Sequence, residues 1–448
     1  MFQLFPWKTV RSRLLAGNAA STPASTPLSE IYVARNGTPE QNMKSVVAML
    51  GGIEKIIGEK DIVILKPNAQ WWHQGMTNTD AMKAFMDLIL EMPGFAGEII
   101  IAENHHHQVD DALGWTTEHR NGSFNYNELV DFYHAKGIHC VSKYHWHDAG
   151  PNPKPRQGNA GNGRLVQGAA QGDGYVWRKD LVYESPEGRK CMMTYPIFTS
   201  AYSGTTIDLK DGAWKNGKYI DTPIKFVNFS ALNHHSHYCG ATASVKNLMG
   251  VVDMTCGHQG PEPAGYWNTH YIGMESAIHK LGGQIRYGCN KFGLGFLAGL
   301  SHDFSVKAGT FNFQYTGGAL GCWMRTIRQP DLNIITAEWV GYGSRIDTSQ
   351  RAHTRTIFAS KDPIALDYHA AKYCLLPATL EHSHDENLAN LHNSDLHDWP
   401  FRKFLEECHR QGIGTLREAD MKIHIKDFND ATPLNPLLCP NSKRPENP

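Results

Sequence analysis

The run from His234 to Cys239 (HHSHYC) is the strongest candidate for chemistry in the sequence, and it follows an apolar stretch typical of a buried strand. In an extended chain, alternate side chains share one face, so His235, His237 and Cys239 would point together. Two imidazoles and a thiolate are good ligands for zinc, iron or nickel. The spacing predicts a divalent metal site. The alternative is a loop whose histidines bond to backbone or water.

A second polar cluster follows the apolar run 99–102, where Glu103 and Asn104 precede the histidine triplet 105–107. A carboxylate and an imidazole can act as base and acid near neutral pH, or can bind a metal. We therefore expect Glu103 and His105 to take part in catalysis. A solvated loop that is rich in histidine is the alternative.

Two lysines closely precede an asparagine, one directly and the other with a proline between. Lys66 ends the apolar run 62–65 and is followed by Pro67 and Asn68, and Lys246-Asn247 lies among small and apolar residues. A lysine at the mouth of a sheet can hold a carboxylate or phosphate, and asparagine both donates and accepts hydrogen bonds. We expect Lys66, Asn68 and Asn247 to bind substrate. Lys246 is expected to be desolvated and chemically active. An ordinary strand end and a solvent-facing helix lysine are the alternatives.

Asp362 is the remaining candidate. It precedes Pro363 and a helical pattern, which is the arrangement of a helix N-cap. We expect it either to cap that helix or to contact substrate.

The elements that must position these residues alternate along the chain. Apolar residues at helical spacing predict helices over 43–57, 82–89 and 126–136, and short apolar runs predict strands at 62–65, 98–102, 138–141, 223–229, 332–336 and 355–359. This alternation is typical of βαβ units and a parallel sheet. Ligands of open α/β sheets sit outside the carboxyl ends of the strands, which is where the polar clusters stand.

The expected fold is α/β: a parallel or mixed sheet flanked by helices, with a Gly/Pro-rich insertion and an irregular C-terminal extension. Residues 1–29 are expected to be a flexible lead-in and residues 30–375 the α/β domain. Residues 150–220 would be the insertion and residues 376–448 the extension.

Composition narrows the class of partner. The formal net charge is −1, so neither nucleic acid nor an anionic membrane is favoured. No apolar run reaches 18 residues and no adequate signal sequence begins the chain, which favours a cytoplasmic protein over an exported mature form. The nine cysteines form no C-x-x-C pair, which argues against a zinc ribbon or a ferredoxin cluster, while 24 histidines suit metal ligation and proton transfer.

Taken in order, these segments resemble the domain-of-unknown-function family 362. The residues that carry the resemblance are Lys66-Pro67-Asn68, Thr79, Glu103, His237, Thr242, Lys246-Asn247 and Asp362-Pro363-x-Ala365-x-Asp367. The chain departs from the family at His235, where the family has lysine, and after Thr79, where Asp80-Ala81 replaces the family's proline. It also lacks the cysteine-rich segment of many relatives, which argues against electron transfer.

The chain is more distantly similar to the lactate racemase family. In that family a histidine and a glycine-rich stretch precede a lysine that carries a covalent nickel-pincer cofactor, and His237 and Lys246 show a similar spacing. The glycines around the family's lysine and the proline after it are missing here. Lys246 would then bind substrate directly.

These patterns predict a metal-dependent enzyme that acts on a small carboxylate-bearing substrate by isomerase, lyase or redox chemistry. His235 and His237 would hold the metal, while Lys66 and Lys246 would bind the anion. The alternative is a metal- or cofactor-binding protein without turnover.

Overall fold

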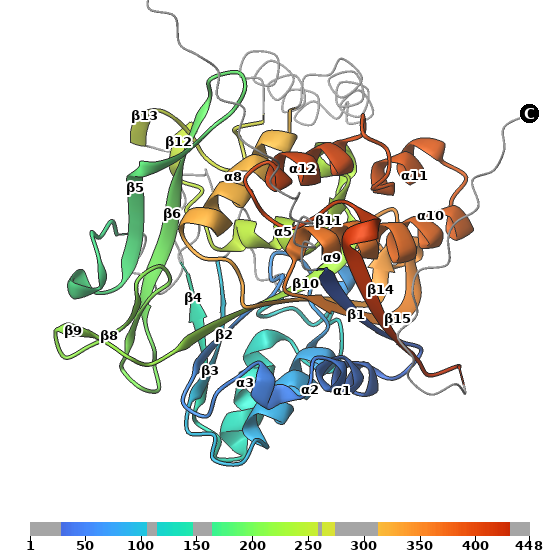
Figure 1. Cartoon of the computed structure of the whole chain (residues 1–448). Coiled ribbons are helices and arrows are strands. Elements are labelled where there is room, and N and C mark those ends of the chain that lie inside the picture. The colour runs from blue at the N-terminus through green and yellow to red at the C-terminus, as the bar shows by residue number, and fades with distance from the viewer. Residues whose placement is uncertain (1–27, 105–113, 147–163, 259–261, 274–311, 431–448) are drawn as a thin grey trace, which may run out of the picture.

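The computed structural model describes residues 28–104, 114–146, 164–258, 262–273 and 312–430. Its centre is a sheet in which β16, β1, β15, β14, β10, β2, β3 and β4 follow one another, with β11 paired to β10 (Figure 1). The strands are β1 (Ser29–Arg35), β2 (Ile62–Lys66), β3 (Glu98–Glu103), β4 (Val141–His145), β10 (Ile224–His234), β11 (Ala241–Thr242), β14 (Leu332–Gly341), β15 (Arg351–Ser360) and β16 (Met421–Asp427).

The sheet is mixed, as the sequence predicts. β14, β10, β2, β3 and β4 are parallel to one another, whereas β15 runs against both of its neighbours. The carboxyl ends of the central strands therefore meet at one edge of the sheet. This is the edge at which the polar clusters were expected.

β2 shows how the sequence fixes the position of a charged residue. All five of its residues are buried, and its side chains alternate between two apolar cores: Ile62 and Ile64 face one, Val63 and Leu65 the other. A continuous apolar run of this kind is typical of a parallel strand covered on both faces. The period of two then places Lys66 on the same face as Ile62 and Ile64.

Helices cover both faces (Figure 1). α1 (Pro39–Met49), α2 (Thr79–Leu90) and α3 (Tyr126–Ala135) pack on the face of Val63 and Leu65. The opposite face is covered by α5 (Ser244–Asn247), α8 (Gln314–Thr326), α9 (Pro363–Ala370) and α12 (Pro400–His409), with α10 (Leu376–His382) and α11 (Glu386–His392) beside them. α4 (Ser236–Cys239) is a single turn after β10.

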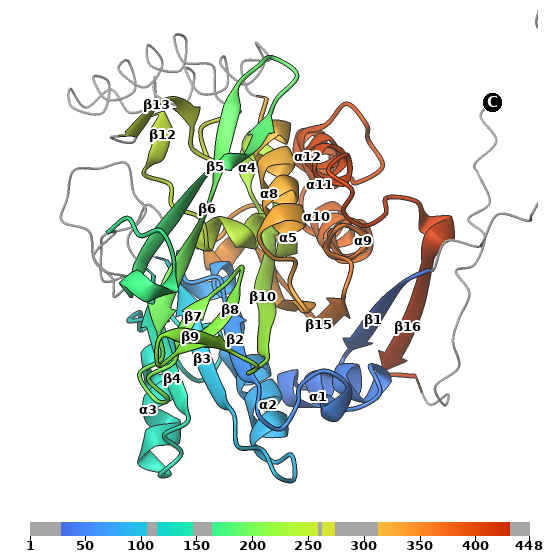
Figure 2. The same cartoon turned by 60° about the vertical axis from the view of Figure 1, so that its left-hand side comes forward.

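A second sheet lies beside the first (Figure 2). Its strands are β5 (Gly174–Glu184), β6 (Lys190–Thr199), β7 (Thr206–Asp208), β8 (Gly212–Lys215), β9 (Lys218–Ile220), β12 (Cys256–His258) and β13 (Glu262–Trp267). The expected insertion, 150–220, supplies β5 to β9. The apolar face of this sheet joins the same core as α8 and α12.

Several boundaries differ from the prediction. The helix predicted over 43–57 ends at Met49, and the strand predicted at 138–141 begins at Val141. The extension after residue 375 contains three helices and then β16, which adds a strand to the main sheet beside β1. The expected lead-in, apart from its last two residues, and the tail after residue 430 lie outside the described residues. None of the described helices combines the length and apolar character that crossing a bilayer would require.

Candidate functional site

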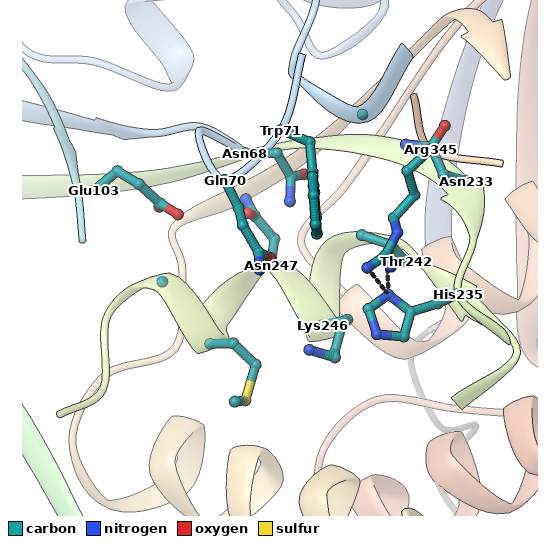
Figure 3. A pocket seen from close by; sticks show the side chains of 13 residues that line it. Asn68, Gln70, Trp71, Glu103, Asn233, His235, Thr242, Lys246, Asn247 and Arg345 are labelled. Atoms are coloured by element: carbon teal, nitrogen blue, oxygen red, sulfur yellow. Dashed lines mark hydrogen bonds between the residues drawn. The ribbon is translucent and has the colours of Figure 1, made fainter. Parts of the chain in front are cut away.

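A small polar pocket opens at the carboxyl ends of four parallel strands (Figure 3). β2 leads into Asn68, Gln70 and Trp71, β3 ends in Glu103, β10 leads into His235, and β14 leads into Arg345; α5 adds Lys246 and Asn247. The cavity that a water-sized probe can enter has a volume of about 20 Å³. One water needs about 10–15 Å³ on this measure, so the pocket is small.

Lys66 and Glu103 form a buried ion pair behind the pocket. The side chain of Lys66 is fully buried, and its Nζ contacts Glu103 and donates to Asn247 Oδ1 at 2.6 Å and to the Pro67 carbonyl at 2.9 Å. Burial raises the pKa of Glu103 to about 8, against the opposing effect of Lys66, and burial lowers the pKa of Lys66. Because Glu103 lines the pocket and Lys66 does not, the lysine holds the carboxyl group that faces the ligand space.

Close packing at Gly250 keeps this pair enclosed. A Cβ atom at Gly250 would lie 2.2 Å from Glu103 Oε1 and 2.4 Å from Lys66 Nζ. The Asn104 side chain donates to the carbonyls of Met249 and Val252, which fixes the backbone on both sides of this glycine. Only glycine therefore fits against the ion pair without displacing it.

Asn247 belongs to a chain of buried amides. Its Nδ2 donates to the Lys66 carbonyl at 3.1 Å and to Asn228 Oδ1 at 2.8 Å, and Asn228 Nδ2 donates to Asn333 Oδ1 at 2.9 Å. These bonds tie α5 to β2, β10 and β14. Fully satisfied buried networks of this kind rigidify a site.

Lys246 projects from α5, whose first turn is fixed by Asp367 of α9. The Asp367 carboxylate accepts hydrogen bonds from the backbone N–H groups of Ser244 and Val245 at 2.8 and 2.9 Å and from the Ser244 hydroxyl. Burial nevertheless raises the pKa of Asp367 to about 7. Asp367, the last residue of the Asp362-Pro363-x-Ala365-x-Asp367 motif, thus fixes the turn from which Lys246 projects.

Lys246 is 5% exposed. Among the described residues it has no ion-pair partner, and its Nζ lies 5.7 Å from the centre of the Phe313 ring. Burial lowers the pKa of Lys246 to about 8, with Arg345 and Lys66 acting in the same direction. A measurable fraction of this amine is therefore uncharged near neutral pH.

Arg345 and His235 stand beside Lys246 (Figure 3). Arg345 is half-buried, lies over the Trp71 ring at 4.7 Å, and has no carboxylate partner in the part of the chain that the structure describes. Its Nη1 lies 3.2 Å from His235 Nδ1, and Thr242 Oγ1 lies 2.7 Å from the same nitrogen. Burial, and then Arg345 and Lys246, hold the pKa of His235 well below its ordinary value.

The pocket thus has a positive end. Within the described ranges no acid is paired with Lys246 or Arg345 there, while the Glu103 carboxyl group is paired with Lys66. Asn68, Gln70 and Thr242 add polar groups around the same space. Buried charges are normally paired, so the charge at this end of the pocket favours an anionic ligand.

Two of the predicted metal ligands, His235 and Cys239, have other hydrogen-bond partners in the structure. The Nδ1 atom of His235 is already bonded to Arg345 and Thr242, and the buried Cys239 thiol donates to the Ala241 carbonyl at 3.3 Å. Burial raises the pKa of Cys239 to about 12, so its sulfur is protonated. Among the described residues no three His, Cys, Asp or Glu side chains are grouped as a metal would need. The side chain of His237 and all of His105 lie outside the described residues.

Most of the other predicted site residues lie at the pocket, whereas Asp362 does not. Glu103, His235, Lys246, Asn247 and Asn68 line one pocket. Asn68 also accepts from the backbone of Ala231 at 2.8 Å, which joins β2 to β10.

Asp362 is elsewhere. Its carboxylate caps α9 through the N–H groups of Ile364 and Ala365 and also accepts from Ser29 and from the backbone of Thr415. Of its two expected roles, the structure shows the helix cap.

Arg345 and Trp71 are the residues that the sequence reasoning missed. Arg345 follows the predicted strand 332–336 through the loop Gly341-Tyr-Gly-Ser, and Trp71 follows Asn68 closely. The rule that ligands gather after parallel strands would have found both, had it been applied to every strand end.

The fold is mixed α/β, with a polar pocket at the carboxyl ends of its parallel strands. Residues 212–372 match the model of the family described as "Domain of unknown function (DUF362)". The predicted resemblance to this family is thereby confirmed, over a stretch that contains His235, Lys246 and Arg345. No curated protein and no solved structure matches the chain. The more distant similarity to lactate racemases stays a prediction.

Proposed function

We propose that this protein is an enzyme that binds a small carboxylate-bearing anion between Lys246 and Arg345. The observation that carries the proposal is the presence of two cationic side chains in one small pocket, neither paired with an acid among the described residues. Guanidinium offers two parallel donors that match a carboxylate, and an ammonium adds a point charge. The pocket is small, which favours a small anion.

The titratable groups favour turnover over simple binding. Lys246 and Glu103 both have pKa values near 8, from burial, and both line the pocket. Groups whose pKa lies near the working pH transfer protons efficiently. Lys246 in its neutral form can take a proton from the ligand or attack it, and the acid form of Glu103 can return a proton. A binding protein without turnover, the alternative, has no need of either shift.

A metal-dependent form of the activity, with zinc, iron or nickel, remains part of the proposal. It rests on the concentration of histidines in the loop after β10, where His237 is the ligand expected from the sequence. The residues described around this loop hold other hydrogen bonds, so no step is assigned to a metal.

The test is anion binding by calorimetry, with oxalate, pyruvate and acetate as carboxylates and inorganic phosphate as the competing class. We expect Lys246→Met and Arg345→Gln each to weaken carboxylate binding roughly 10- to 100-fold, the value of a hydrogen bond to a charged group. Lys83→Met is the matched control, because Lys83 is paired with Asp87 on α2, away from the pocket. Unchanged affinity in both pocket variants, or tight binding of phosphate alone, would overturn the proposal.

A further inference from the structure

We infer that Lys246 forms an imine with the carbonyl carbon of a small 2-oxo carboxylate, whose carboxylate Arg345 holds. The inference rests on the proposed function and deepens it, since it names the substrate class and the bond that is made. It requires an amine that is free to react and, beside it, a cation that can hold the carboxylate of the substrate. The pocket offers each of these.

The amine of Lys246, unlike that of Lys66, has no polar partner among the described residues. Lys66, at the end of β2, has its Nζ occupied by Glu103, by Asn247, which follows Lys246 in the chain, and by the Pro67 carbonyl. Lys246 has no hydrogen bond or ion pair among the described residues and packs against the Phe313 ring. The two buried lysines thus differ in whether the side-chain nitrogen already has polar partners.

The backbone position of Lys246 is fixed by hydrogen bonds to the residues on either side of it in α5. The Asp367 carboxylate holds the N–H groups of Ser244 and Val245, and Asn247 is bonded to β2 and β10. The residue between these anchors is Lys246. An orientation fixed on both sides reduces the entropy lost when the amine meets a carbonyl carbon.

Acid–base state agrees with the geometry. Burial lowers the pKa of Lys246 to about 8, so the neutral, nucleophilic amine is present at physiological pH. A lysine desolvated beside another cation is a known route to an activated amine. Arg345 is that cation here.

The step balances as follows. The Lys246 nitrogen lone pair forms the C–N bond while the carbonyl π pair moves to oxygen, and one N–H proton passes to that oxygen. A second proton, from the acid form of Glu103 or from solvent, lets the hydroxyl leave as water, and the C=N bond forms. No oxidant or reductant is needed. The resulting iminium withdraws electrons from the bond next to it, which supports the isomerase or lyase chemistry expected from the sequence.

The experiment is reductive trapping. The full-length protein is mixed with glyoxylate or pyruvate and then with sodium borohydride, which reduces the imine to a stable secondary amine. Intact mass and peptide mapping give the extent and the place of labelling. We expect about one label per chain, on Lys246, and no label on Lys66.

Two variants separate the lysine's charge from its reactivity. Lys246→Arg keeps a cation, so we expect oxalate binding to persist while trapping is lost. Arg345→Gln should lower trapping by pyruvate roughly 10- to 100-fold, while trapping by acetone, which has no carboxylate, should change little. Thermal unfolding midpoints check that each variant is folded.

The inference is overturned if wild-type protein binds oxalate but takes no label on Lys246, or if label is spread equally over exposed lysines such as Lys44 and Lys190. In that outcome the proposed anion site stands alone. If oxalate itself does not bind, the proposed function fails as well.

Discussion

Arg345 Nη1 lies 3.2 Å from His235 Nδ1, and this contact fixes the protonation state of the imidazole. A guanidinium has donors only, so Nδ1 must accept, and the single proton of the neutral ring stands on Nε2. The Thr242 hydroxyl, 2.7 Å from the same Nδ1, must then donate as well. His235 is therefore a hydrogen-bond donor through Nε2 rather than a ready metal ligand.

This relationship gives a spectroscopic prediction. At pH 7 we expect the imidazole ¹⁵N shifts of His235 to report the Nε2–H tautomer alone, because Arg345 excludes a proton from Nδ1. In Arg345→Met the exclusion is lost, and a mixture with the Nδ1–H tautomer should appear, since Nδ1–H can donate to Thr242. His397, which is exposed and paired with Glu406 instead, is the internal control and should not change between the two proteins. A wild-type His235 in the Nδ1–H form would contradict the assignment.

Carboxylate binding should weaken as pH rises through about 8. Lys246 attracts the anion only when protonated, and its pKa in the free protein is about 8. Glu103 acts in the same direction, because its pKa is also about 8 and ionisation adds a negative charge to the pocket. His235 stays neutral over this range and Arg345 stays charged, so neither contributes to the slope.

The measurement is the dissociation constant of oxalate between pH 6.5 and 9.5. We expect a flat region at the acid end and then a decline of up to about tenfold per pH unit for the loss of one proton. Lys246→Met should remove most of the decline, and Glu103→Gln only part of it. A wild-type affinity that rises with pH would show that neither group titrates as described.

The sequence predicted the arrangement around β2 and β3 well because each step rests on local rules. An apolar run long enough for one strand, ended by Lys66-Pro67, fixes both the strand and the place of its polar exit. Glu103 follows from the same pattern one strand later. Both residues therefore reach one edge of a parallel sheet without knowledge of the rest of the fold.

The roles within that edge were harder to predict, since they depend on long-range packing. Nothing local shows that Lys66 is enclosed by Gly250 and paired with Glu103 whereas Lys246 is left open. The expected alternation of His235 and Cys239 also failed to hold, because the chain turns into α4 directly after β10 and is no longer extended. A period of two applies only while the strand continues.

The Lys66–Glu103 pair offers a test of stability. Removing one partner leaves the other buried without its hydrogen-bond partner, so Lys66→Met should lower the free energy of unfolding by about 1–3 kcal/mol. Glu103→Leu alone should cost a similar amount, whereas the double variant should cost clearly less than the sum, because no polar group is then left without its partner. Denaturant unfolding of the four proteins gives the coupling energy. Additive effects would show that the two groups do not interact.

Metal removal separates the two forms of the proposed activity. We expect oxalate binding to survive treatment with a chelator, because Lys246 and Arg345 supply the charge. Elemental analysis before and after treatment, on protein purified without a histidine tag, verifies that any metal has left. If binding is lost and returns with zinc, iron or nickel, and if His237→Ala reproduces the loss, the metal-dependent form is correct and the metal-free anion site is not.

The pairing of β16 with β1 has a consequence for how the molecule is made. β1 is among the first described segments to leave the ribosome, yet the strand that covers its outer edge, Met421–Asp427, is nearly the last. Until then β1 presents unpaired backbone groups, a template on which other chains can add strands. A chain shortened before Met421 would retain every described residue of the pocket. We expect such a chain to associate with other copies through the exposed edge of β1, while its pocket stays intact.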